Sequence, residues 1–496
     1  MALLSWKVVH GGKTPPPGEV VRPDERMSWG RTTGIGIQHV LAMFGATFVL
    51  PPIMGIPGTT AVFFSGIGTL IFLLIVRNRI PSYLGTSASF IAPTFAVYAG
   101  GGDLHDVLFG VLATGVIFAI VGLIVNAVGE AWIHVLLPPV LTGTVVMLIG
   151  LNLAGPVARD AYWNNDQWLA LVTLTITILL LVFLRGFLRR IAILIAVVVG
   201  WVVAKLMDVL NIAQLHDAQG NVVDRVHFAY TAPGAKTPTT LGQADWIGLP
   251  DFTAPHWSGN ALLLFLPVVI ILIAENTGHV KAVSEMTGAD LDKDLGRAFI
   301  GDGVATTVAG AFGGAGTTTY AENIGVMAAT RIYSTAAYGI AAIVAILFGL
   351  CPKFGVLVGS VPAGVLGGVT IVLYGMIAVL GAKIWVSNRV DFGQTRNLVP
   401  AAVGIILGAG DITLKINDKV SLGGITLGTI VALITFHLFR LVANPEDDAS
   451  GVVTPTTAYV EDDAPPEGRH GGHHRADEPP APEDGTDTDE DGIQPS

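Results

Sequence analysis

Residues 313–331 read Gly313-Gly-Ala-Gly-Thr-Thr-Thr-Tyr-Ala-Glu-Asn-Ile-Gly-Val-Met-Ala-Ala-Thr-Arg331. Glycine and threonine interrupt an apolar sequence here, and a carboxylate, Glu322, follows them. In a helix, glycine costs about 1 kcal/mol relative to alanine, and threonine is restricted at χ1. The stretch is therefore a poor continuous helix. A second carboxylate, Glu275, follows the apolar run 262–274 and precedes His279 by four residues.

The composition is that of a polytopic membrane protein. Of the 496 residues, 51% are hydrophobic and only 13% are charged, whereas globular proteins carry about 25% charged residues. The net charge of −11 arises in the tail, since residues 445–496 hold 15 Asp or Glu against two Arg. The single cysteine, Cys351, excludes a disulfide framework and a cysteine metal cluster. In lipid, intramembrane ionisable residues are functional candidates.

The hydropathy pattern predicts fourteen spans, since a membrane-spanning helix needs about 20 apolar residues. They are expected at residues 33–51, 58–76, 81–99, 106–128, 138–155, 166–184, 191–206, 260–280, 296–312, 315–331, 335–350, 363–382, 397–410 and 421–441. Basic residues follow the even-numbered spans, such as Arg77 and Arg79 after the second and Arg185 and Arg189 after the sixth. The positive-inside rule then makes both termini cytoplasmic, in a multi-pass protein of the cell inner (cytoplasmic) membrane.

Two pairs of similar segments indicate an internal repeat. Residues 141–150 resemble residues 366–375, and Gly85-Thr-Ser-Ala-Ser-Phe90 resembles Gly316-Thr-Thr-Thr-Tyr320 at nearly the same offset. Because seven is odd, two halves of seven spans are inverted relative to one another, as in many transporters. The predicted fold class is an all-α polytopic membrane protein with 14 transmembrane segments in two inverted seven-span repeats.

The stretches 85–90 in span 3 and 313–320 in span 10 are predicted to be short extended segments followed by half-helices, facing each other and not lipid. Glycine-mediated packing of continuous helices is the alternative.

The predicted regions are a cytoplasmic N-terminal segment (1–30), the first section of a core domain (31–130), the first section of a gate domain (131–207), an extracytoplasmic loop (208–257), the second section of the core domain (258–352), the second section of the gate domain (353–442) and a disordered acidic tail (443–496).

Two carboxylates are the leading site candidates. Glu275 and His279 stand at positions i and i+4 and share one helix face, which suits a pair that takes up and releases a proton. A buried hydrogen bond between them that only joins helices is the alternative. Glu322 stands at the expected start of a half-helix, where free N–H groups and the dipole favour anionic or carbonyl groups. A simple first-turn cap is its alternative.

Two carboxylates with free backbone donors complement a flat ring that has both N–H donors and carbonyl acceptors, such as uracil. Tyr374 and Phe90 are candidates for stacking on that ring, with ordinary packing as the alternative. Gln38 and His39 open an apolar helix; His39 either joins a proton network or bonds a neighbouring backbone group. Asp302 is expected to brace the core through hydrogen bonds.

Several blocks resemble the nucleobase-ascorbate transporters, also called nucleobase:cation symporter 2. They are Glu322-Asn323-Ile-Gly-Val-Met-Ala-Ala-Thr-Arg331, Gln38-His39-Val-Leu-Ala-Met-Phe-Gly-Ala-Thr47, Ala274-Glu275-Asn-Thr-Gly-His279 and Pro81-Ser-Tyr-Leu-Gly85. The similarity covers residues 26–441, and residues 297–303 and 383–391 make the chain look most like the family's bacterial pyrimidine-utilisation and uracil permeases.

The resemblance implies two inverted repeats, a core and a gate domain, a homodimer and proton-coupled uptake by alternating access. It implies that Glu275 and Glu322 hold the base, that His279 supports proton coupling, and that backbone groups beside Ala88 and Ala321 contact the base. The residues expected to support this site are Gln38, Asn323 and Asp302, with His39 as a further proton-coupling candidate and Tyr374 as a further substrate contact.

Two positions depart from the uracil permeases, which commonly carry Phe where this chain has Ala88 and Gly where it has Ala321. The smaller side chain at position 88 leaves more room beside the ring, which predicts a range wider than uracil. Purine and ascorbate members usually carry Gln or Pro at the position of Glu322, which favours a pyrimidine here.

The leading hypothesis is a proton-coupled symporter that imports uracil or another pyrimidine, with the proton as coupling ion and no cofactor, metal or nucleic acid. A xanthine or urate permease of the same family is the first alternative, and an anion exchanger or channel is the second. An enzyme is not expected, because the sequence carries no His-Glu-x-x-His, Gly-x-Ser-x-Gly or phosphate-loop motif.

Overall fold

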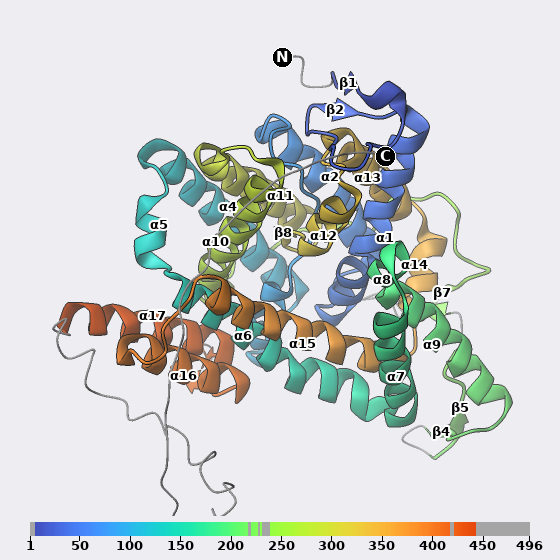
Figure 1. Cartoon of the computed structure of the whole chain (residues 1–496). Helices are drawn as coiled ribbons and strands as arrows, with labels where there is room; N and C mark the ends of the chain where they lie inside the picture. The colour runs from blue at the N-terminus through green and yellow to red at the C-terminus, as the bar shows by residue number, and fades with distance from the viewer. Residues whose placement is uncertain (1–4, 217–219, 227–228, 231–238, 417–420, 443–496) are drawn as a thin grey trace, which may run out of the picture. The chain divides into compact units, whose positions relative to one another are not determined.

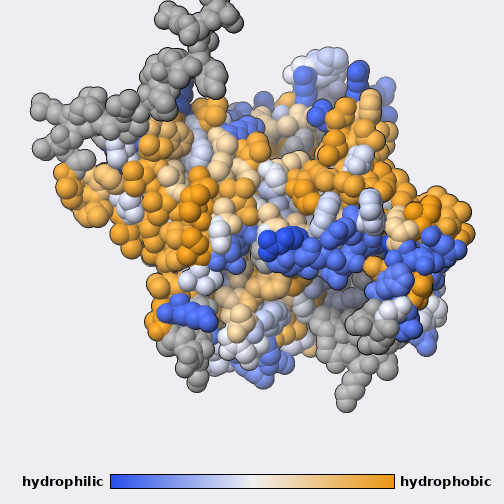
Figure 2. Space-filling view, turned by 90° about the horizontal axis from the view of Figure 1, so that it is seen from below, coloured by the Kyte–Doolittle hydropathy of each residue, from blue (hydrophilic) through white to orange (hydrophobic). Residues whose placement is uncertain are grey.

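The computed structural model describes residues 5–216, 220–226, 229–230, 239–416 and 421–442, most of them helical (Figure 1). The predicted acidic tail, 443–496, lies outside these residues. On the face seen in Figure 2, hydrophobic side chains form broad continuous areas beside a hydrophilic band. Extended apolar surface of this kind is typical of a chain whose outer helices face lipid.

The two halves of the chain contain the same elements in the same order. The first half has α1 (Trp29–Ile53), α2 (Gly58–Ile75), β3 (Leu84–Thr86), α3 (Ile91–Ala99), α4 (Leu104–Val128), α5 (Ala131–Leu136), α6 (Pro139–Leu153), α7 (Gln167–Phe183), α8 (Gly186–Arg190) and α9 (Ala192–Val209). The second has α10 (Gly259–Thr287), α11 (Leu295–Phe312), β8 (Thr317–Thr319), α12 (Ala321–Thr330), α13 (Thr335–Gly349), α14 (Pro352–Gly359), α15 (Ala363–Ser387), α16 (Thr395–Ala409) and α17 (Gly424–Val442). Apart from the short α8, each element of the first half has a counterpart in the second.

The remaining strands are short pairs outside these helices. They are β1 (Lys7–Val8) with β2 (Glu25–Arg26), β4 (Leu215–His216) with β5 (Val222–Val223), β6 (Ala229–Tyr230) with β7 (Thr239–Thr240), and β9 (Leu414–Lys415) with β10 (Ser421–Leu422). A π-helix (Ala154–Tyr162) continues α6.

Every predicted span coincides with one or two of these elements, with small shifts at the ends. Among the described residues, seven helices are long and apolar enough to cross a membrane, and two bent pairs, α1 and α13–α14, bring the number to nine. The helices α7 and α16 and the segment 88–99 are apolar but shorter. The chain is thus a multi-pass membrane protein, and the number fourteen stays a prediction.

The helix contacts obey the symmetry of an inverted repeat. Where α2 packs on α13, its counterpart α11 packs on α4, and the contact of α1 with α13 is matched by that of α10 with α4. We call the helices α1–α4 and α10–α13 the strand set, because they surround β3 and β8. A second set, which we call the α15 set, contains α6, α7, α9, α15, α16 and α17 and repeats the pattern, since α15 packs on α7 as α6 packs on α16.

The segment before α1 packs against the corner between α12 and α13. The backbone N–H of Val21 donates to the carbonyl of Arg331 (3.0 Å), and the N–H of Tyr333 donates to the carbonyl of Val21 (2.7 Å). The indole Nε1 of Trp6 donates to Thr335 Oγ1 (2.8 Å). The N-terminal segment is therefore folded onto the end of the half-helix that begins with the signature block.

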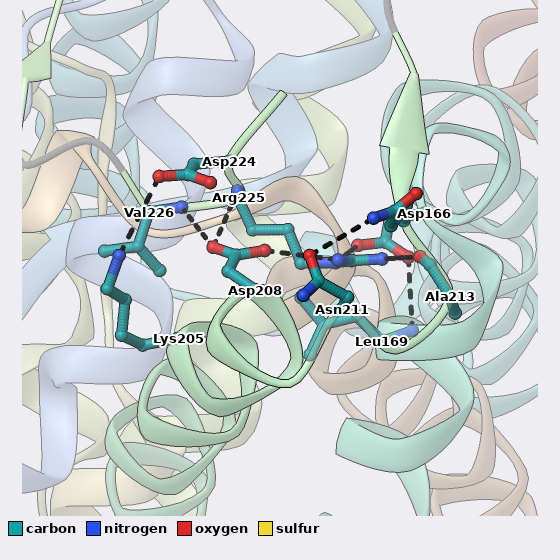
Figure 3. A network of polar contacts seen from close by, with 10 residues as sticks. Asp166, Leu169, Lys205, Asp208, Asn211, Ala213, Asp224, Arg225 and Val226 are labelled. Carbon is teal, nitrogen blue, oxygen red and sulfur yellow. Dashed lines mark hydrogen bonds and ion pairs between the residues drawn. The ribbon is translucent and has the colours of Figure 1, made fainter. Parts of the chain in front are cut away.

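An arginine fixes the start of the long loop after α9 (Figure 3). The guanidinium of Arg225 donates to Asp166 Oδ2 (2.6 Å) at the start of α7 and to Asp208 Oδ1 (3.2 Å) at the end of α9. The same guanidinium donates to the carbonyl of Ala213. Burial by itself lowers the pKa of Arg225, but hydrogen bonds and charges from the two aspartates outweigh that effect, so its pKa is raised.

Candidate functional site

The two broken stretches pair with each other. Strand β3 runs antiparallel to β8, with Leu84 opposite Thr319, Gly85 opposite Thr318 and Thr86 opposite Thr317. This confirms the predicted extended segments and excludes continuous helices at both places. The strands are shorter than the predicted stretches, because residues 88–90 already form a helical turn that leads into α3.

Threonine and serine hydroxyls complete the hydrogen bonding of the two strands. Thr69 of α2 accepts from the backbone N–H of Leu84 (2.9 Å), and Thr306 of α11 accepts from that of Thr317 (3.0 Å). The hydroxyl of Ser65 donates to the carbonyl of Leu84 (2.7 Å). Unpaired backbone groups are costly in hydrocarbon, so these counterpart helices supply what neighbouring strands would supply in a larger sheet.

Gly85 within β3 and Gly316 directly before β8 are each covered by an aromatic ring from the other half. A Cβ atom at Gly85 would lie 2.4 Å from the ring of Tyr320, and one at Gly316 would lie 2.4 Å from the ring of Phe90. The hydroxyl of Tyr320 also accepts from Thr47 (3.0 Å) and donates to the carbonyl of Thr86 (2.8 Å). The two glycines therefore allow the halves to approach closely.

A chain of hydrogen bonds links α10, β8 and α11. His279 Nδ1 lies 2.7 Å from Thr319 Oγ1, which donates to Asn276 Oδ1 (3.2 Å). Asn276 Nδ2 donates to Asp302 Oδ2 (2.9 Å), and Thr317 Oγ1 donates to Asp302 Oδ1 (2.7 Å). The brace expected of Asp302 is thus present, and the hydrogen bond of His279 goes to Thr319 and not to Glu275.

Glu275 stands on α10 beside this hydrogen-bond chain, next to Asn276 in the sequence. It is half-buried on α10 and interacts with Thr318, the central residue of β8. Asp302 and Glu322 are the acidic groups that act on it electrostatically. The structure therefore brings together the two carboxylates that lie 47 positions apart in the sequence, as the prediction requires.

Glu322 occupies the first turn of α12, directly after β8. Its side chain and that of Ala321 are exposed, and Ala88 is half-buried where the helical turn before α3 begins. Both half-helices thus start at the strand pair, with the positive ends of their dipoles there. Before α3, the N–H groups of Ser89 and Phe90 donate to Ser87, which leaves the first turn of α12 as the source of free N–H groups. An exposed carboxylate beside these ends is accessible to a polar ligand.

His39 and Asn323 join α1 to α12 beside Glu322. The amide Nδ2 of Asn323 donates to the carbonyl of His39 (3.0 Å) and lies 3.2 Å from its Nδ1, and the imidazole lies 4.2 Å from the ring of Tyr338. Both the side chain and the backbone of His39 are therefore bonded to one partner. Gln38, the residue before it, is half-buried.

The two proposed stacking residues lie in different sets of helices. Phe90 is fully buried, and its ring packs over Gly316 and against Phe265. Tyr374 is buried on α15 and lines a cavity of about 380 Å³ together with residues of α6, the π-helix and α7, and with Trp163 from the turn between the last two. Phe90 thus has a packing role, and the cavity that Tyr374 lines belongs to the α15 set.

Sequence reasoning missed the threonines. Thr306, Thr317 and Thr319 carry hydrogen bonds of the strand pair, whereas the sequence prediction uses threonine only as a residue that weakens a helix. The sequence signal for Thr317 and Thr319 is the run of three threonines at residues 317–319 in an apolar stretch, since hydroxyls that cannot all bond their own backbone need other partners; Thr306 has no such signal. Across the ranges given above, no group of three or more His, Cys, Asp or Glu side chains is arranged to hold a metal ion.

Known proteins with similar sequences are permeases. The model of the Permease family matches residues 30–416. The "Putative pyrimidine permease RutG" of Escherichia coli K12 is 45% identical over 420 residues, covering 83% of this chain and 89% of that protein. The "Uracil permease" of Bacillus caldolyticus is 36% identical and covers 83% of this chain and 92% of its own length, and that of Escherichia coli K12 is 34% identical, with 84% and 94% covered.

Two solved transporters share the fold at low sequence identity. The murine anion transporter Slc26a9 in its inward-facing state superposes with a TM-score of 0.61 at 12% identity, covering 84% of this chain and 70% of that one. The transmembrane domain of the cyanobacterial bicarbonate transporter BicA gives a TM-score of 0.50 at 15% identity, with 82% and 96% covered. The inverted repeat is thus the architecture of known membrane transporters, and the chain belongs to the nucleobase-ascorbate transporter family, the Permease family of uracil and pyrimidine permeases.

Proposed function

We propose that this permease is a proton-coupled symporter that imports uracil or a related pyrimidine by alternating access. The observation that carries the proposal is the meeting of Glu275 with the strand pair and the first turn of α12, where Glu322 stands. Two carboxylates accept hydrogen bonds from ring N–H groups, and free N–H groups at the start of α12 donate to ring carbonyls.

The base lies between Glu275 and Glu322, with backbone groups beside Ala88 and Ala321 completing its contacts. Neither alanine fills the site, which leaves room for a substituent on the ring, such as the methyl group of thymine. In this arrangement Tyr374 meets the base only if the α15 set moves against the strand set during the transport cycle.

The coupling proton binds at the Glu275 and His279 end of the hydrogen-bond chain. His279 is linked through Thr319 and Asn276 to Asp302, so a change in its protonation alters the bonds that hold β8. That link supports coupling between proton binding and the shape of the base site. His39 contributes through Asn323, the residue next to Glu322, and Gln38 supports it from the same turn. No cofactor enters this scheme.

The strand set corresponds to the proposed core domain and the α15 set to the proposed gate domain, and transport follows from their relative movement. The working unit is a homodimer in the cytoplasmic membrane, with both termini on the cytoplasmic side. The basic residues beside the even-numbered spans support this orientation.

The test is uptake of labelled uracil into proteoliposomes, with and without an imposed inward proton gradient. Glu275→Gln and Glu322→Gln should each reduce uptake at least tenfold, since losing a charged hydrogen-bond acceptor costs about 1.5–3 kcal/mol. The matched control is Glu285→Gln, a change at an exposed glutamate three turns further along α10, which should leave uptake unchanged. Full uptake by both site variants would contradict the assignment.

Competition separates the alternatives. Unlabelled thymine should reduce uracil uptake, whereas xanthine and urate should not. If a purine competes better than uracil, the protein is a purine permease of the same family. Flux of chloride or bicarbonate that needs no proton gradient would instead identify an anion exchanger.

A further inference from the structure

Five large apolar side chains are exposed on one short loop segment, residues 245–257: Phe252 is half exposed, and the other four are exposed over most of their surface. Trp246, Ile247, Leu249 and Trp257 expose 74%, 84%, 74% and 79% of their surface. The segment lies outside all predicted spans, so its exposed apolar residues are not explained as parts of a spanning helix. A surface of this kind marks contact with a membrane or a partner.

The backbone of this segment is fixed to the ends of four helices of the strand set. The carbonyl of Asp251 accepts from Thr60 at the start of α2 (3.0 Å), and Gly248 N donates to the carbonyl of Leu350 just after α13 (3.0 Å). Thr253 N donates to the carbonyl of Phe312 at the end of α11 (3.3 Å). His105 at the start of α4 lies 2.6 Å from the carbonyl of Ala254 through Nδ1. The exposed side chains are therefore held at one end of the strand set.

Both ends of the segment continue apolar stripes of spanning helices. On α13, Ile343 and Leu347 are exposed one turn apart and lead to the position where Gly248 is bound. On α4, the exposed stripe is Val116, Ile120 and Leu123, and Trp257 packs on Phe109 nearer the start of that helix, with ring centroids 4.9 Å apart. Exposed apolar stripes on spanning helices face lipid. Residues 245–257 therefore lie at the edge of the hydrocarbon core of the bilayer, next to the ends of these stripes.

We infer that residues 245–257 form a membrane-surface anchor whose aromatic and aliphatic side chains enter the headgroup region of the leaflet at this end of the strand set. Tryptophan is enriched at that depth, because its ring is apolar and its N–H is polar. The ammonium of Lys353 lies 4.8 Å from the ring centroid of Trp246, a cation at the height expected for lipid phosphates. The anchor fixes the depth of the strand set in the membrane, independently of the proposed substrate.

Spin labelling tests this proposal in the full chain reconstituted into phosphatidylcholine and phosphatidylglycerol vesicles. Cys351 is the only cysteine, so C351A gives a background for single labels at Ile247→Cys and Leu249→Cys. Gln243→Cys, an exposed polar position shortly before the segment, serves as the water reference, and Leu347→Cys on α13 serves as the hydrocarbon reference. The measurement is the ratio of collision rates with oxygen, which concentrates in the bilayer, and with a water-soluble nickel chelate.

The ratio at positions 247 and 249 should exceed that at 243 at least threefold and stay below that at 347. A ratio equal to that at 243 would place the segment in water and overturn the proposal. Protection from both reagents would also overturn it, since the segment would then be covered by a protein partner or by a second copy of the chain.

Discussion

Replacing Arg225 by methionine should destabilise the protein strongly. The side chains of Arg225, Asp166 and Asp208 expose only 2%, 6% and 4% of their surface. The substitution keeps an apolar stem of similar length but leaves two carboxylates buried without their cation. Removing one partner of a buried ion pair costs about 3–5 kcal/mol.

Backbone N–H groups still donate to both buried carboxylates in the variant, which offsets part of this free-energy cost. Asp208 Oδ2 still accepts from the backbone N–H groups of Arg225 (2.9 Å) and Val226 (3.3 Å), and Asp166 Oδ1 accepts from the N–H of Leu169 at the start of α7 (3.3 Å). We therefore expect the lower end of the range, about 3 kcal/mol. At about 2.1 cal/mol/K of unfolding entropy per residue, a folded region of roughly 440 residues then shows a fall in Tm of about 3 °C.

The assay is thermal unfolding of the purified protein in detergent, followed by intrinsic tryptophan fluorescence. Lys205→Met is the matched control, because the pair of Lys205 with Asp224 is long (3.8 Å) and both side chains are about half exposed. It should leave Tm unchanged within the error of the measurement. A triple variant with Arg225→Met, Asp166→Asn and Asp208→Asn removes all three charges and should recover most of the loss. If Arg225→Met alone unfolds like the wild type, the buried-charge argument is wrong.

Three further substitutions test the strand pair. Gly316→Ala places a Cβ 2.4 Å from the ring of Phe90 and should abolish uracil uptake in vesicles, whereas Gly325→Ala on α12, where that space is open, should preserve it. Tyr320→Phe removes one hydroxyl with two partners and should lower stability by about 1–2 kcal/mol, read as a fall in Tm. Asp302→Ala removes the acceptor shared by Asn276 and Thr317, which keep their contacts with the Leu272 carbonyl and Thr306 Oγ1, and should cost about 1–3 kcal/mol in the same assay, while a Tm equal to that of the wild type would show that water replaces the carboxylate.

The broken spans could be predicted because their cause is local. Glycine and threonine weaken a helix wherever they occur together, and the two stretches stand out against apolar surroundings. The register, in which Leu84 faces Thr319, could not be predicted, because it depends on which hydroxyls of α2 and α11 reach the strands. Threonine in a helix commonly bonds its own backbone four residues earlier, so nothing in the sequence assigns Thr69 and Thr306 to strands.

The acidic residues were found for the opposite reason. A carboxylate in a span is rare and costly, so Glu275 and Glu322 stand out from composition alone, and the structure brings them to one strand pair. Tyr374 could not be selected in this way, because an aromatic residue in a span is more often packing than part of a site; the structure places it in the wall of a cavity in the α15 set. Arg225 could not be found either, since its two aspartates lie 59 and 17 positions away in the sequence.

The pairing of β3 with β8 also sets the order in which the chain matures. Leu84 pairs with Thr319, which is synthesised 235 residues later. At about 5–20 residues per second, synthesis of those residues takes roughly 10 to 50 s. During that time the third span has no strand partner, and each unpaired backbone group in hydrocarbon costs several kcal/mol. The first half is therefore an insertion intermediate whose β3 backbone groups are unpaired. The strand pair at the centre of the strand set forms only after the second half has been inserted.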